Sequence, residues 1–255
     1  DGGAGTDTLS VNMTANFSGM TADVGSVTNV EVLDITNGSS LTRSFDTTGI
    51  SGLKTVKVDT NDQAFTVADL ESTNLRVELS NADEAKTVTL TYATLNGTSV
   101  NAGTSDSLAL ALNDVGTAEV KNAAGTVTTA QKTLDVVAAG IEDLTIESNG
   151  TSNFFDASIG TSKTLTTTGA ADLKVTAVDS TLTQVDGSAA TGDLTLDLTA
   201  GGAFTSIKTG TGDDSVTVDT LNVEAVLAGG AGADTLVLKN LAAGTYQPAM
   251  TGFET

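Results

Sequence analysis

The sequence predicts an all-β protein that folds as a parallel β-solenoid with about 21 residues in each coil. Apolar pairs recur along the chain at a nearly constant spacing, and glycine-containing turns separate them. Apolar residues that alternate with polar ones are typical of strands with one face in a core. The pairs, whose first members are 21, 22 and 20 residues apart, are Leu173/Val175, Leu194/Leu196, Val216/Val218 and Leu236/Leu238.

The same spacing extends into the N-terminal half. Ile35, Val58 and Leu79 end three expected strands, and Leu90 and Leu112 continue this series less regularly. Alternation along such strands places the apolar residues in the core and the charged ones in solvent. We therefore expect residues 1–255 to form one repeat-built unit, with a less regular insert at residues 91–140, where the pattern weakens.

Tandem β-sandwich modules are the alternative fold. Asn-Gly dipeptides favour tight turns between antiparallel strands, and they occur at residues 37–38, 96–97 and 149–150. Sandwiches need turn signals about every 8–12 residues. Strand pairing separates the two folds, because sandwiches predict antiparallel neighbours and the solenoid predicts parallel ones.

Two glycine-rich turns near the C-terminus carry the strongest chemical signal. Residues 229–236 read Gly-Gly-Ala-Gly-Ala-Asp-Thr-Leu, and residues 209–216 read Thr-Gly-Thr-Gly-Asp-Asp-Ser-Val. Glycine admits left-handed backbone conformations, and a turn built this way points its carbonyl oxygens inward. Asp214 and Asp234 lie 20 residues apart, which suits one coil. Ca²⁺ prefers about six to eight oxygen ligands, so two stacked turns are needed to share one ion.

The predicted calcium ligands are therefore two carboxylates and the oxygens around them. Asp214 and Asp234 are the main ligands, with Asp213 and the carbonyl groups near four glycines as co-ligands. These glycines are Gly210, Gly212, Gly230 and Gly232.

A third copy of the motif, Gly-Gly-Ala-Gly-Thr-Asp-Thr-Leu, occupies residues 2–9. It predicts a similar site made by Asp7 with Gly3 and Gly5. We expect this site to be weak or without an ion, because no upstream partner turn is present. The motif recurs 227 residues later, at Gly229, so the chain is expected to be one period of a longer array.

Other acidic residues recur at similar places. Ser105-Asp106-Ser107-Leu108 resembles a degenerate copy of the motif without its glycine pair. Apolar segments that contain a glutamate are interpreted as half-buried strands with the glutamate facing outward, and a role of these glutamates as metal or lattice ligands is the alternative. These glutamates are Glu31, Glu142, Glu224 and Glu254.

Composition excludes several classes of function. The chain has 11 basic and 32 acidic residues, and this net charge of −21 disfavours nucleic acid and anionic membranes as partners. It contains no histidine and no cysteine, which removes Ser-His-Asp and Cys-His catalysis and thiolate metal sites. No apolar run approaches the roughly 18 residues of a membrane span. We expect neither enzyme activity nor membrane insertion.

The motifs resemble those of known families. The glycine-rich nonapeptides are similar to those of RTX proteins. Residues 16–20 (Asn-Phe-Ser-Gly-Met), 29–37 (Asn-Val-Glu-Val-Leu-Asp-Ile-Thr-Asn) and 44–50 (Ser-Phe-Asp-Thr-Thr-Gly-Ile) look like surface-layer proteins of Gram-negative bacteria. The Campylobacter surface-array type is the nearest in pattern and the Caulobacter type is more distant. The likeness is clearest over residues 1–58 and 186–255.

The resemblance implies an extracellular structural segment. In that family, calcium-loaded β-solenoids tile the bacterial cell surface by self-association into a two-dimensional array. A separate region binds lipopolysaccharide and a C-terminal signal directs type I secretion, and we expect neither within these residues. An RTX adhesin, or the non-catalytic part of a secreted RTX protein, is the alternative, and it would bind a host or polymer ligand instead of copies of itself.

Overall fold

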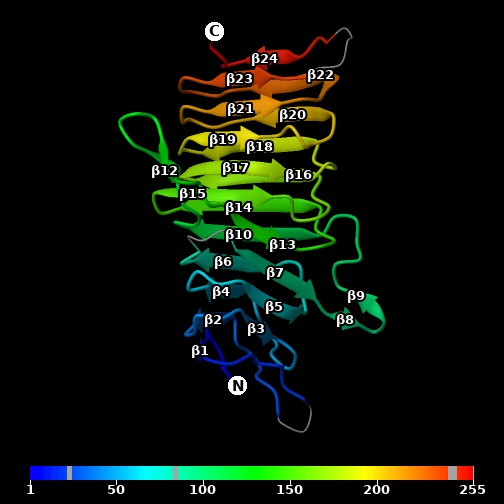
Figure 1. The fold of residues 1–255 in the computed structure, drawn as a ribbon. Helices are drawn as coiled ribbons and strands as arrows, with labels where there is room; N and C mark the ends of the chain where they lie inside the picture. Colours follow the sequence, from blue (N-terminus) through cyan, green and yellow to red (C-terminus); the bar gives the residue numbers. More distant parts are fainter. Residues whose placement is uncertain (22–24, 83–85, 241–245, 255) are drawn as a thin grey trace.

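The structure is a computed structural model that describes residues 1–21, 25–82, 86–240 and 246–254. Its strands stack into two long parallel sheets of 11 and 9 strands, with the chain termini at opposite ends of the stack (Figure 1). The described residues contain no α-helix, and so none that could span a membrane. The parallel β-solenoid is confirmed. The sandwich alternative is wrong, because successive strands of both long sheets pair in parallel.

The 11-stranded sheet receives one strand from each coil. Its strands, in spatial order, are β1 (Thr8–Met13), β2 (Val32–Asn37), β4 (Thr55–Asp59), β6 (Arg76–Ser80), β10 (Ser107–Asn113), β14 (Asp143–Asn149), β16 (Thr164–Gly169), β18 (Gln184–Ala190), β20 (Phe204–Lys208), β22 (Leu221–Ala228) and β24 (Ala249–Thr251).

The 9-stranded sheet takes the alternate strands of the coils. Its order is β23 (Thr235–Leu238), β21 (Ser215–Val218), β19 (Leu194–Asp197), β17 (Asp172–Val178), β15 (Ser152–Ala157), β13 (Leu134–Val137), β7 (Thr87–Tyr92), β5 (Phe65–Leu70) and β3 (Arg43–Asp46).

The core lies between the two sheets and follows the alternation of the strands. Ile35 pairs with Val58, Val58 with Leu79, and Leu79 with Leu112, so four of the expected strand ends form one buried ladder. The fifth member of that series is placed wrongly, because Leu90 lies in β7 and belongs to the other sheet. Sequence spacing alone does not distinguish the sheets, since both repeat once in every coil. Burial of these ladders supplies about 25 cal/mol for each Å² of apolar surface.

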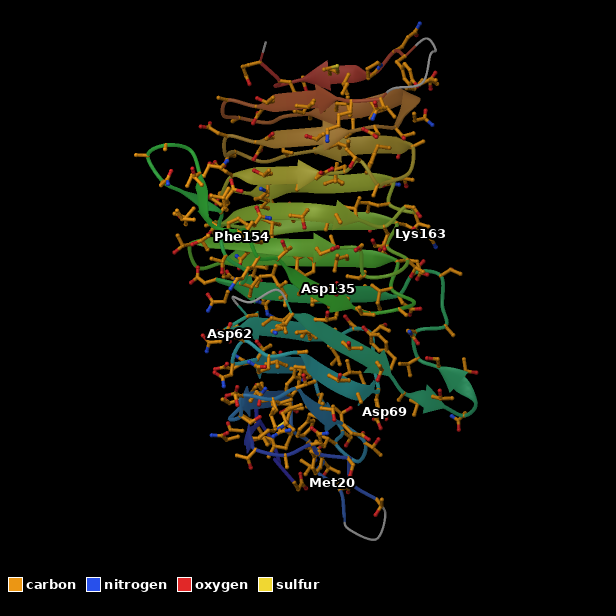
Figure 2. All side chains as sticks on the ribbon, in the orientation of Figure 1. Met20, Asp62, Asp69, Asp135, Phe154 and Lys163 are labelled. Carbon is orange, nitrogen blue, oxygen red and sulfur yellow. The ribbon has the colours of Figure 1, made fainter. Side chains whose placement is uncertain are left out.

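Residues 91–140 contain two antiparallel excursions from the coils. β8 (Thr94–Leu95) pairs with β9 (Thr98–Ser99), and β11 (Val120–Lys121) pairs with β12 (Val127–Thr129). Both project sideways from the stack (Figure 1). Asn96 and Gly97 join the first pair with positive φ angles of 53° and 80°, as a tight hairpin requires. Phe154 lies beside the base of the second excursion, where a Cβ on Gly116 would be 2.7 Å from its own (Figure 2).

Candidate metal centre

The two C-terminal glycine turns lie one above the other where the chain crosses between the sheets. The turn at residues 209–214 joins β20 to β21, and the turn at 229–234 joins β22 to β23. The N–H of Ala231 donates to the carbonyl of Gly210 over 3.0 Å, and the N–H of Thr235 donates to that of Asp214 over 2.8 Å. Each turn thus rests on the turn of the coil before it.

Both motif aspartates point into the interior, and each is only 1% exposed. The reason is the pairing register of β19 and β21, which the spacing of apolar residues does not reveal. Leu196, and not Leu194, pairs with Val216, so the expected step of 22 residues is wrong here. Leu194 therefore aligns with Asp214, which takes an inward position that a core residue would normally fill. A spacing argument that counts only apolar residues misses such a position.

The carboxylate of Asp214 is fully hydrogen-bonded within the protein. Its Oδ1 accepts the N–H of Leu194 over 2.7 Å, and its Oδ2 accepts the N–H of Gly210 over 3.0 Å. Thr209, which is 3% exposed, donates its hydroxyl to the carbonyl of Gly229. Burial raises the pKa of Asp214 above its ordinary value, the hydrogen bonds from Leu194 and Gly210 oppose the rise, and the charge of Asp234 adds to it.

The carboxylate of Asp234 differs from that of Asp214 in the hydrogen bonding of one oxygen. Its Oδ1 accepts the N–H of Asp214 over 2.9 Å, but its Oδ2 is buried without a hydrogen-bond partner. A Cβ added to Gly229 would lie 2.7 Å from this Oδ2 and 2.3 Å from the carbonyl oxygen of Gly252. Two acceptor oxygens thus border one small space that a side chain on Gly229 would enter. A buried acceptor without a donor costs about 1–3 kcal/mol.

Asp213 lies on the outside of the turn. It is exposed, its carboxylate accepts the N–H of Ala233 over 2.9 Å, and its N–H donates to Asp193 over 2.7 Å. The N–H of Asp193 donates in turn to Asp172 over 3.0 Å. Neither the glycine motif nor the apolar spacing predicts this outer row of aspartates. Its signal was an aspartate directly before or within each turn, at steps of about one coil.

The four motif glycines keep the stacked turns in close contact. Gly230 and Gly232 adopt φ angles of 100° and 132°, whereas Gly210 and Gly212 do not enter the left-handed region. A Cβ on Gly230 would lie 1.9 Å from the carbonyl oxygen of Gly210, and one on Gly232 would lie 2.1 Å from that of Gly212. The carbonyl groups of the lower turn therefore point at the upper turn.

The N-terminal copy has the same local arrangement as the turn at 229–234. Asp7 Oδ2 is buried without a partner, and the N–H of Asp7 donates to Glu31 over 3.0 Å. A Cβ on Gly2 would lie 2.1 Å from the carbonyl oxygen of Asn29. Gly3 and Gly5, with φ of 91° and 124°, face open space. Asp7 therefore meets its partner turn downstream, although β1 and β23 belong to different sheets.

Three recurring glutamates lie just outside the strands and contact a motif aspartate. The N–H groups of Asp7, Asp106 and Asp234 donate to Glu31, Glu142 and Glu254, over 3.0, 3.0 and 2.5 Å respectively. The interpretation as outward strand residues is therefore wrong for these three. It holds for Glu224, which is exposed in β22.

The donor set suits a hard cation. Within the described ranges, no three acidic, histidine or cysteine side chains gather as a ready metal cluster. An ion beside Asp234 would therefore need backbone carbonyl oxygens in addition to carboxylates, which is the ligand chemistry of Ca²⁺. Zn²⁺ favours nitrogen and sulfur ligands, and the chain has neither histidine nor cysteine.

Comparison of the chain with protein-family models, curated proteins and solved structures gives no match.

Proposed function

We propose that this chain is a calcium-dependent structural segment of an RTX-type bacterial surface-layer protein, which builds or spaces a lattice outside the cell. The observation that carries the proposal is Asp234 Oδ2, a buried carboxylate oxygen without a donor, in a glycine turn between stacked coils. A cation there would remove an electrostatic cost that the protein alone leaves uncompensated.

The architecture suits a spacer. Coils in continuous parallel sheets advance about 4.8 Å each along the stack, so the segment is long and resists bending. The net charge of −21 repels other copies, and bound Ca²⁺ would reduce that repulsion. Self-association is the proposed partnership. Attachment to lipopolysaccharide and type I secretion are assigned to regions outside these residues, and no catalytic role is proposed.

Thermal unfolding with and without calcium tests the metal part of the proposal. Extracellular modules bind Ca²⁺ with Kd of about 10⁻⁴–10⁻³ M. At 10 mM Ca²⁺ each such site would stabilise the fold by about 1.4–2.7 kcal/mol. We expect a higher Tm in calcium than in chelator, and a smaller rise in Mg²⁺, which demands stricter octahedral geometry. Equal melting temperatures in calcium and chelator would contradict the proposal.

An adhesive role is the second candidate, and one feature favours it. A groove of about 380 Å³ lies beside the base of the β11–β12 excursion and is lined by Phe154, Asp172 and Lys174 among others. An aromatic ring flanked by opposite charges suits a polymer or host ligand. Electron microscopy of the chain in calcium separates the two roles. Ordered sheets support the lattice role, and dispersed monomers support the adhesive one.

A further inference from the structure

The contact between two successive turns is called a joint. The joint between the turns at 209–214 and 229–234 contains a hydroxyl group, whereas the joint one coil later has no side chain at the corresponding position. We propose that the hydroxyl of Thr209 replaces a cation at this joint, and that calcium binds at the two turns whose first motif residue is glycine. One ion would lie by Asp234, Gly252 and Glu254, and the other by Asp7, Asn29 and Glu31. This inference rests on the proposed calcium binding and assigns its sites.

Backbone hydrogen bonds establish which residues correspond. The N–H of Thr209 donates to the carbonyl of Ala228 over 2.8 Å, and the N–H of Gly229 donates to that of Thr251 over 2.9 Å. Thr209 therefore corresponds to Gly229, and Gly229 corresponds in turn to Gly252. The Thr209 hydroxyl donates its single proton to the carbonyl of Gly229 in the next coil, and both oxygens of Asp214 are satisfied by backbone N–H groups.

One coil later, a carboxylate oxygen and a carbonyl oxygen again border the same space, but no hydroxyl group lies between them. Asp234 is 1% exposed, so water does not reach its Oδ2, and no protein donor does either. The carbonyl oxygen of Gly252 borders the same space. Both atoms are acceptors, and only a donor or a cation relieves their mutual repulsion. Glu254 adds a second carboxylate through its contact with the N–H of Asp234.

The N-terminal turn repeats this arrangement at the other end of the molecule. Gly2 corresponds to Gly229, because its N–H donates to the carbonyl of Thr28 over 2.9 Å as that of Gly229 does to Thr251. Asp7 Oδ2 is again buried without a donor, and the carbonyl oxygen of Asn29 borders the Cβ position of Gly2. The expectation of a weak Asp7 site assumed an upstream partner turn, whereas the partner lies downstream.

The degenerate copy at Asp106 provides an internal control. Its Oδ2 accepts the N–H of Gly103 over 2.7 Å and its Oδ1 accepts the hydroxyl of Thr73 over 3.4 Å. Both oxygens thus have protein donors, as those of Asp214 do. The carboxylates of Asp106 and Asp214 have protein donors at both oxygens. The strict copies, at Asp7 and Asp234, each have one buried oxygen without a donor. We therefore assign two ions to the chain.

Calcium stoichiometry, measured by equilibrium dialysis and calorimetry, tests the assignment. We expect two ions on the unchanged chain and one on Asp234→Asn or Asp7→Asn. Asp214→Asn and Thr209→Ser should keep two ions, and Thr209→Gly should gain a third. Asp186→Asn, at an exposed position of β18, is the matched control and should keep two.

The outcomes separate this inference from the proposed function. Loss of an ion in Asp214→Asn, or unchanged stoichiometry in a folded Thr209→Gly, overturns the role of Thr209 while calcium binding stands. Unchanged binding in Asp234→Asn overturns the assigned site. Absence of binding to the unchanged chain overturns both this inference and the calcium dependence. Circular dichroism in the same buffers establishes that each variant is folded.

Discussion

The turns at 209–214 and 229–234 lie one coil apart, yet their glycines differ in backbone conformation and their carboxylates are satisfied differently. Asp214 accepts hydrogen bonds at both oxygens, whereas Asp234 accepts one at a single oxygen. The backbone N–H of Gly210 reaches Asp214 Oδ2, and Asp234 Oδ2 has no such donor. Thr209 and Gly229 differ in another way, because only Thr209 offers a hydroxyl to the carbonyl of the next coil. The two joints thus differ in whether the protein alone satisfies the buried carboxylate and the carbonyl that borders it. The predictions below test this contrast.

The largest effect is expected from Gly230→Ala, which would force the two turns apart. The new Cβ would overlap the carbonyl oxygen of Gly210 at 1.9 Å, on a backbone with φ of 100°. We expect a loss of about 3–5 kcal/mol in the free energy of unfolding. Gly3→Ala is the matched control, because it has a φ of 91° but open space around it. It should cost only about 1 kcal/mol, the left-handed penalty alone. Equal losses in urea unfolding would show that the turns are not in contact.

Thr209→Val should destabilise the protein by about 1–3 kcal/mol in chelator, because it leaves the buried carbonyl of Gly229 without its hydroxyl donor. Thr209→Ser restores the hydroxyl and should recover most of that loss. Added calcium should not rescue the valine variant, since the methyl group fills the space. A calcium rescue as large as that of Thr209→Gly would contradict this account.

Asp234→Asn should stabilise the metal-free protein by about 1 kcal/mol, since it removes a buried charge and offers an amide donor near the carbonyl of Gly252. In calcium its gain in Tm should be smaller than that of the unchanged chain. Melting curves of the variant and the unchanged chain, in chelator and in calcium, measure both differences. The idea fails if the variant is less stable in chelator and keeps the full calcium response.

The smallest effect concerns an exposed ion pair outside the turns. Arg76 on β6 reaches over β10 to Glu147 on β14, at 2.6 Å, and its hydrogen bond lowers the pKa of Glu147. A lowered pKa stabilises the folded state above the ordinary pKa of glutamate and loses that effect as the pH falls below it. Glu147→Gln should therefore cost about 0.5 kcal/mol at pH 7 and low salt, and almost nothing at pH 3. Urea unfolding at both pH values measures the difference, which should be the same with and without calcium.

The spacing of apolar residues was sufficient to predict the class of fold. Val56 and Val58 face the core and Lys57 faces solvent, as strand alternation requires. Each coil repeats the same local pattern, so parallel stacking follows from the period. The pattern did not assign Leu90 to its sheet, because each coil crosses both sheets. It also misaligned Leu194 by two residues relative to the strand of the next coil, because an aspartate occupies the inward position that Leu194 faces there.

By itself, the sequence determined which residues form turns, which face inward, and that Asp214 and Asp234 lie one coil apart. These features depend on neighbours along the chain, through glycine backbone freedom and strand alternation. Only the tertiary structure decided which carboxylate oxygen lacks a donor. The N–H groups that reach Asp214 and Asp234 come partly from residues 20 positions away, in an adjacent coil. Such hydrogen bonds depend on how the coils stack on one another, and a motif in the linear sequence does not contain that information.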